Sequence, residues 1–208
     1  MSLYQRLLGN PFVYNHVRPL VVGGVDYGSS WAALGVGADD VVLDVGCGTG
    51  DALNHLGAVR SYRGYDPDPV AIDFARKRAA ARGPEYQFHC GLVEPRTVTE
   101  VAPTRVMLCG LLHHLSDDEA LSLLDMLARA ETVRRIVTVD VVYLPGKLVN
   151  NLFAWLDRGK HVRDVEGYRA LIERVDVRVV SERVVRSHPE KGRVEYLAYA
   201  LEPRRSRS

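Results

Sequence analysis

Ten consecutive residues constrain the fold of this chain more than any other segment. Val41–Val45 is an apolar run broken only by Asp44, as expected of a buried parallel strand. It leads into Gly46-Cys47-Gly48-Thr49-Gly50, where alternate residues lack a side chain and leave the backbone open to a ligand. Thr49 is placed to cap a following helix, whose free N–H groups would face that ligand. The order strand, glycine turn, helix predicts the ligand-binding corner of a doubly wound α/β fold.

The spacing of these glycines indicates which ligand class binds. A dinucleotide fingerprint needs glycine at the first, third and sixth positions, but the sixth position here is Asp51. Asp44 also precedes the first glycine, where a pyrophosphate would gain nothing from a negative charge. A ligand with an ammonium or sulfonium group would be stabilised by that carboxylate. A nicotinamide-dependent oxidoreductase is therefore disfavoured.

The segment from Asp44 to Gly50 resembles the leading motif of the class I S-adenosylmethionine-dependent methyltransferases, Asp/Glu-x-Gly-x-Gly-x-Gly. The resemblance implies S-adenosylmethionine as the cofactor, held by Asp44, Gly46, Cys47, Gly48, Thr49 and Gly50. Asp66 lies twenty residues after Gly46 at the end of a second predicted strand. It matches the acidic residue with which this family binds the ribose hydroxyl groups. Pro67 is expected to lie along the adenine face.

Two further segments resemble the family. Relatives often carry Gly-Asp-Ala after the third strand, whereas this chain has Gly91-Leu92-Val93, so the backbone of Leu92 and Val93 is expected at the adenine edge. Glu94 is a candidate substitute for the missing carboxylate. Cys109-Gly110-Leu111-Leu112-His113-His114-Leu115 resembles the segment after the fourth strand, with Cys109 and Gly110 near the methionine part of the cofactor. His113 and His114 are candidate catalytic bases, or alternatively a pair kept as architecture.

The rest of the chain alternates predicted strands and helices. Strands are expected at 62–65, 86–90, 105–109 and 135–142, and a closing hairpin at 177–186 and 194–201. Asp68 and Pro69 begin a helix to about Arg82, with Val70, Phe74 and Ala75 as its buried stripe. The resemblance implies an α/β, Rossmann-like, seven-stranded sheet that is mostly parallel. Helices cover both faces, and one antiparallel strand lies beside the fifth.

We expect one methyltransferase domain over residues 1–208. It comprises a helical N-terminal lid (1–35), a core (36–202), a helical insertion within that core (144–163) and a disordered tail (203–208). Lid and insertion are expected to wall the acceptor pocket, with Tyr14, Arg18, Tyr143 and His161 as substrate-binding residues. The stretch Gly159–Arg163 resembles Gly-x-x-x-Arg segments near the acceptor pocket of small-molecule methyltransferases, but an ordinary network of Arg163 and Glu166 at a helix entry is favoured.

The amino-acid composition narrows the classes of partner that the protein is expected to bind. The 27 basic and 26 acidic residues give a net charge of +1, and no basic stripe with interleaved aromatic residues occurs. This favours a small-molecule methyl acceptor over nucleic acid. The N-terminus lacks a signal pattern and no apolar run reaches membrane-spanning length, so a cytoplasmic protein without membrane contact is expected.

Other features leave alternatives open. Cys47, Cys90 and Cys109 lack metal-ligand spacing, and no carboxylate cluster suggests a divalent ion, so no metal is expected. The sequence leaves the oligomeric state unknown. A methyltransferase-fold binding or regulatory protein without catalysis would keep the same cofactor motifs, and it remains the alternative to an enzyme.

Overall fold

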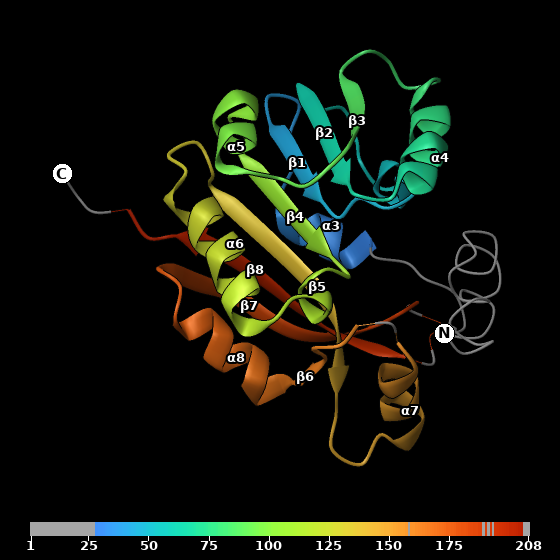
Figure 1. Ribbon diagram of the computed structural model, residues 1–208, viewed down its shortest axis with the longest axis vertical. Coiled ribbons are helices and arrows are strands. Elements are labelled where there is room, and N and C mark those ends of the chain that lie inside the picture. Colours follow the sequence, from blue (N-terminus) through green and yellow to red (C-terminus); the bar gives the residue numbers. More distant parts are fainter. Residues whose placement is uncertain (1–27, 158, 189, 191, 193, 206–208) are drawn as a thin grey trace.

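The computed structural model describes residues 28–157, 159–188, 190, 192 and 194–205 (Figure 1). Its strands are β1 (Val41–Val45), β2 (Ser61–Asp66), β3 (Tyr86–Cys90), β4 (Arg105–Cys109), β5 (Arg135–Tyr143), β6 (Arg163–Asp164), β7 (Val177–Arg186) and β8 (Glu195–Pro203). Its helices are α3 (Gly28–Leu34), α4 (Pro69–Ala79), α5 (Pro95–Val101), α6 (Asp117–Arg129), α7 (Leu148–Leu156) and α8 (Val165–Glu173). Two short 3₁₀ helices are η2 (Asp51–Asn54) and η3 (Leu112–His114).

The sheet has the predicted topology. Its strand order is β3-β2-β1-β4-β5-β8-β7, with the two-residue β6 paired to β5. β1 is parallel to β2 and β4, and β8 runs antiparallel between β5 and β7. The chain moves outward from β1 to β2 and β3 and then crosses back to β4. The connections therefore diverge between β1 and β4, which is where ligands bind in open α/β sheets.

Helices cover both faces of the sheet (Figure 1). On one face, Leu34 of α3, Ile72 of α4 and Ala154 of α7 pack into one buried apolar cluster. On the other face, Val98 of α5, Leu124 of α6 and apolar residues of α8 pack into a second. The sheet is thus buried on both sides, which explains the nearly continuous apolar runs of its central strands.

Helix starts follow from local chemistry. The Asp68 carboxylate accepts a hydrogen bond from Val70 N at 2.9 Å and begins α4, with Pro69 in the first turn. Ser116 and Glu119 form a capping box at the start of α6. The start of α4 at Asp68 and Pro69 is where the sequence predicts it.

Two local predictions were wrong. Thr49 does not cap the next helix, because Gly50 occupies the cap position and only the 3₁₀ turn η2 follows. Val70 and Phe74 are 48% and 46% exposed. The buried face of α4 is formed by neighbouring small and branched residues, namely Ala71, Ile72, Ala75 and Ala79. Small side chains let the helix approach β2 and β3 closely, and the larger ones turn outward.

The expected domain parts need adjustment at their edges. Within 144–163 only α7 is helical, and β6 begins at Arg163. Pro203 is the last residue of β8, and Arg204 Nε donates to Val177 O at 3.1 Å. The expected disorder therefore does not extend to Pro203 and Arg204, while 206–208 lie outside the described residues. Residues 1–27, which hold most of the expected lid, also lie outside them.

Candidate functional site

The loops that follow β1, β2, β3 and β4 all lie at one edge of the sheet, at the carboxyl ends of these parallel strands. Backbone hydrogen bonds tie these loops together. Gly46 N and Cys47 N donate to Tyr65 O at 2.8 and 3.0 Å, and Gly91 N donates to Asp66 O at 3.0 Å. The loops after β1, β2 and β3 therefore form one connected platform.

Three glycines on these loops leave the backbone uncovered. Gly48, Gly91 and Gly110 have φ of 52°, 151° and 66°. A Cβ built on Gly48 or Gly91 would meet no atom within 4 Å, and one on Gly110 only His113 Cε1 at 3.8 Å. Since these positions border open space, a ligand can lie directly against the main chain.

The other two glycines of the motif serve packing. A Cβ on Gly46 would come within 3.2 Å of Leu111, and one on Gly50 within 3.1 Å of Phe88. These positions hold the loop close to its neighbours. Within the motif, Gly48 alone borders open space.

Asp66 faces this platform from the end of β2. One carboxylate oxygen accepts from Gly48 N at 2.9 Å and the other from Asp68 N at 2.9 Å. Each carboxylate oxygen has a second lone pair, so Asp66 retains acceptor capacity for ligand hydroxyl groups. The carboxylate that the sequence singles out thus lies beside the open glycine.

Asp44 lies beneath the loop rather than on it. It is 3% exposed, and Tyr62, which is fully buried, donates its hydroxyl hydrogen to the carboxylate at 2.5 Å. Burial raises the pKa of Asp44 to about 7 despite this hydrogen bond, and the charges of Asp66 and Asp51 add to the rise. The sequence did not identify Tyr62 as a partner of Asp44, because a tyrosine at this strand position is expected to be an ordinary core residue.

The remaining motif side chains point inward. Cys47 and Thr49 are each 8% exposed, and burial raises the pKa of the Cys47 thiol. Burial also raises the pKa of Cys109 well above its usual value. These thiols stay protonated, and the contribution of these three residues to a ligand would come from their backbone.

The part of the platform where adenine is predicted to lie is apolar. Pro67 is exposed, Leu92 is 72% exposed and Val93 is half-buried. Pro67 and Leu92 follow β2 and β3, so they flank Asp66. Glu94 instead begins α5 in a capping box with Thr97, which leaves it a structural role. Its suggested contact with adenine is not favoured.

His113 is enclosed by two carboxylates. Its Nδ1 lies 2.9 Å from Asp140 Oδ1 and its Nε2 lies 3.1 Å from Asp157 Oδ1. Burial lowers the pKa of His113, but the hydrogen bonds to both carboxylates outweigh it and raise the pKa to about 9. A protonated, 2% exposed imidazole between two acceptors is not poised as a base. The exposed His114 stays a predicted catalytic residue.

The segment after α7 packs on η3. A Cβ on Gly159 would overlap His113, and His161 N donates to His113 O at 3.0 Å. Arg163 donates to Leu112 O and Leu115 O, each at 2.9 Å, and pairs with Asp117. The expected partner Glu166 pairs with Arg169 instead.

The predicted substrate-binding residues divide into two groups. Tyr143, half-buried at the end of β5, and the exposed side chain of His161 belong to the described part of the chain. Tyr14 and Arg18 lie outside it. Contact of these residues with an acceptor stays a prediction.

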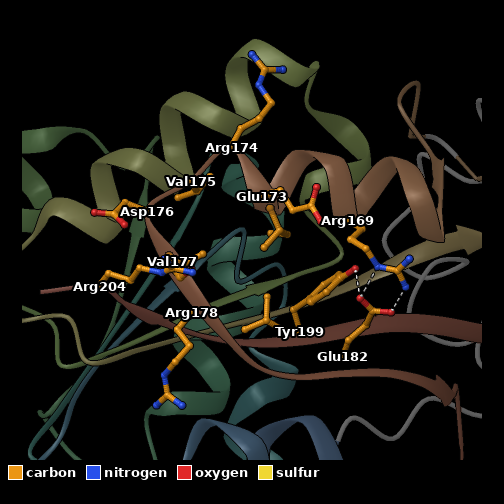
Figure 2. A pocket seen from close by; sticks show the side chains of 12 residues that line it. Arg169, Glu173, Arg174, Val175, Asp176, Val177, Arg178, Glu182, Tyr199 and Arg204 are labelled. Atoms are coloured by element: carbon orange, nitrogen blue, oxygen red, sulfur yellow. Dashed lines mark hydrogen bonds and ion pairs between the residues drawn. The ribbon is translucent and has the colours of Figure 1, made fainter.

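A separate cavity of about 680 Å³ lies between α8 and the strands β7 and β8 (Figure 2). Some of the polar side chains that line it pair with one another. Arg169 pairs with Glu182, which also accepts from the Tyr199 hydroxyl at 3.0 Å. None of its lining residues belongs to the glycine platform, so we place the functional site at the platform.

Comparison with known proteins identifies a family model that matches part of the chain. Residues 42–132 match the family model described as a methyltransferase domain. No curated protein is significantly similar in sequence. In the described residues, no helix is long and apolar enough to span a membrane.

Solved structures share the fold at low identity. A Haloferax volcanii complex of the Trm112 methyltransferase activator with a protein described as a methyltransferase matches at 14% identity and a TM-score of 0.68, over 95% of this chain and 98% of that one. Human N-acetylserotonin methyltransferase with S-adenosylmethionine matches at 16% and 0.63, over 97% and 59%. An O-methyltransferase of neocarzinostatin biosynthesis, bound to S-adenosylmethionine and a naphthoic acid, matches at 19% and 0.61, over 98% and 62%.

The strand order, the glycine platform and the matched family model agree. The Asp44–Gly50 motif lies within the matched residues, at the divergence of β1 and β4. Residues 42–132 match the methyltransferase-domain family, and the chain as a whole has the fold of solved methyltransferases, two of which contain S-adenosylmethionine.

Proposed function

We propose that this protein binds S-adenosylmethionine on the glycine platform and transfers its methyl group to a small organic acceptor. The observation that carries the proposal is the open space over Gly48 beside the Asp66 carboxylate. Open glycine backbone suits the close approach of a nucleoside, and Asp66 has lone pairs for its ribose hydroxyls. Pro67 and Leu92 offer apolar surface for adenine, and Gly110 leaves room for the methionine part.

The protein's task in such a transfer is mainly positional. When bound, the cofactor supplies a methyl group already activated by a positive sulfur. The residues of this chain need only hold an acceptor in line and exclude water, and alignment contributes roughly 7–11 kcal/mol in favourable cases. Arg163 holds the segment 159–163 against η3, and together they form a wall next to Gly110.

Three observations favour a small acceptor. Formal charge is nearly balanced, which gives no broad attraction for a nucleic acid backbone. Two similar structures are named for small organic substrates or contain one. Tyr143 and the exposed apolar residues of α7, Leu152 and Trp155, provide apolar surface near the end of β5. The activator complex among the similar structures makes a protein partner the second arrangement to test.

Calorimetry on the purified chain tests the cofactor. We expect binding of S-adenosylmethionine and S-adenosylhomocysteine and no comparable affinity for NAD or NADP, since the dinucleotide spacing of glycines is missing. The reverse preference would overturn the proposal. A panel of small organic acceptors, with tRNA and protein as comparison substrates, is then assayed for release of S-adenosylhomocysteine. Cofactor binding with no turnover on any class would favour the binding-protein alternative.

The raised pKa of Asp44 predicts a pH dependence of cofactor binding. A positively charged cofactor favours the ionised carboxylate, whereas in the free protein the pKa of Asp44 is about 7. Affinity should therefore be constant above this pH and fall about tenfold per pH unit below it, because the carboxylate must first lose its proton. Titrations from about pH 5 to pH 8 measure this slope. Asp44→Asn should bind more weakly with a flat profile, and a flat wild-type profile would remove Asp44 from the cofactor's charge recognition.

A further inference from the structure

Three potential metal ligands converge beside the platform. His113 and His114 end η3, and Asp157 follows the last residue of α7. One ligand atom from each lies within 4.8 Å of the others. The two imidazole rings, although adjacent in sequence, have centroids 4.2 Å apart and planes tilted by 39°. The fold therefore turns both rings to the same side.

Two of the three ligands, the buried His113 and the half-buried Asp157, each have a partner that orients them. The Nδ1 of His113 faces Asp140 Oδ1 at 2.9 Å, which leaves Nε2 directed at Asp157. Asp157 Oδ1 in turn accepts from Gly159 N at 2.9 Å. Metal-binding histidines almost always donate their second ring nitrogen to a carboxylate or carbonyl, and ligating carboxylates are themselves hydrogen-bonded. His113 and Asp157 both show this arrangement.

A simple ion pair between His113 and Asp157 accounts for less of the geometry of this cluster than a metal site does. The pair between His113 and Asp157 needs no second imidazole, yet a ring nitrogen of His114 lies within reach. Asp140 Oδ2 is buried and has no hydrogen-bond partner among the described residues.

We propose that His113 Nε2, a ring nitrogen of His114 and Asp157 Oδ1 bind one divalent ion of the zinc type. Two imidazoles and one carboxylate select Zn²⁺ or Fe²⁺ over Mg²⁺ and Ca²⁺, which prefer all-oxygen ligands. Ligands at zinc–ligand distances of about 2.0–2.1 Å and tetrahedral angles lie roughly 3.3 Å apart. The 3.1 Å between His113 Nε2 and Asp157 Oδ1 is close to this value. Binding displaces the Nε2 proton to solvent.

The site goes beyond the proposed methyl transfer and does not depend on it. With three protein ligands, a tetrahedral ion keeps a fourth position for water or for an oxygen or nitrogen atom of a bound molecule. It also departs from the sequence-based expectation of no metal. That expectation rested on the cysteine spacing and on the missing carboxylate cluster, and the sequence had no means of placing Asp157 beside the two histidines.

Metal titration of the chelator-treated, full-length chain tests the site without any assay of turnover. We expect one Zn²⁺ per chain by calorimetry, no competition from Mg²⁺, and strong visible absorption bands of a tetrahedral centre when Co²⁺ is used. His114→Ala, at an exposed position, should weaken Zn²⁺ binding by at least about tenfold. Asp140→Asn should weaken it about 10–100-fold through the orientation of His113.

Control variants distinguish loss of the proposed Zn²⁺ site from other causes of weaker binding. His55→Ala removes another exposed histidine and should leave Zn²⁺ affinity unchanged. Melting curves without metal identify any variant that fails to fold, and Asp157→Asn then replaces it as the ligand test. The proposal is overturned if wild-type protein binds no stoichiometric Zn²⁺, or if His114→Ala binds like wild type. It is also overturned if Cys90→Ser, at the exposed cysteine, abolishes binding instead.

Discussion

Replacing Gly48 by valine should abolish binding of S-adenosylmethionine. Gly48 has φ of 52° and its missing Cβ would face open space, where we place the cofactor. An isopropyl group there fills that space and keeps the ligand off the main chain. We expect a loss of at least about a hundredfold, or roughly 2.7 kcal/mol, measured by calorimetry with S-adenosylhomocysteine.

Gly35→Val is the matched control for backbone strain. Gly35 has φ of 64°, and a Cβ there also meets nothing within 4 Å. It follows α3 at the opposite edge of the sheet, where its carbonyl accepts from Arg105. Both variants pay the left-handed strain of roughly 1–2 kcal/mol, but only Gly48→Val should lose the ligand. Normal binding by a folded Gly48→Val protein would show that the cofactor does not lie on this loop.

Asp66→Ala should weaken cofactor binding about 10- to 150-fold, equivalent to roughly 1.5–3 kcal/mol for hydrogen bonds to a charged group. The substitution removes the expected ribose acceptor and also the partner of Gly48 N, so the loop loses an anchor. Calorimetry against the same ligand measures the loss. Asp66→Asn retains one acceptor oxygen and should give a smaller loss.

Asp68→Ala separates ligand binding from stability. Asp68 is an exposed carboxylate in the same loop that caps α4 through Val70 N. Its removal should cost about 0.5–2 kcal/mol of folding stability with little change in affinity. If Asp68→Ala weakens binding as much as Asp66→Ala, the two variants disturb the loop alike and the ribose assignment is wrong.

Much of the fold follows from local sequence signals. β3 and β4 occupy the predicted residues 86–90 and 105–109, α4 begins at the predicted cap of Asp68 and Pro69, and α7 lies within the predicted helical insertion. α5 was missed, since its seven residues from Pro95 hold little apolar periodicity. The face of α4 was misjudged, because composition does not say whether small or large apolar residues meet the sheet.

Only those parts of the candidate site that lie in contiguous sequence motifs could be predicted. The Asp44–Gly50 loop and Asp66 could be identified because glycine spacing and strand ends are visible in one dimension. Tyr62, Asp140 and Asp157 could not, because each acts through a contact made by the tertiary fold. Asp140 also lies within an apolar strand, and nothing local relates it to His113, from which it is separated by 27 positions in the sequence.

The contacts of Arg163 with Leu112, Leu115 and Asp117 limit where segments can be exchanged between related proteins. Grafting a foreign stretch in place of residues 144–163 is the obvious way to reshape the acceptor pocket that we propose. Here the last residue of that stretch fixes the carbonyls of Leu112 and Leu115, which belong to the turn between Gly110 and α6. A graft without arginine at this position would loosen that turn. Chimeras should therefore be joined before residue 163, so that the recipient keeps its own guanidinium.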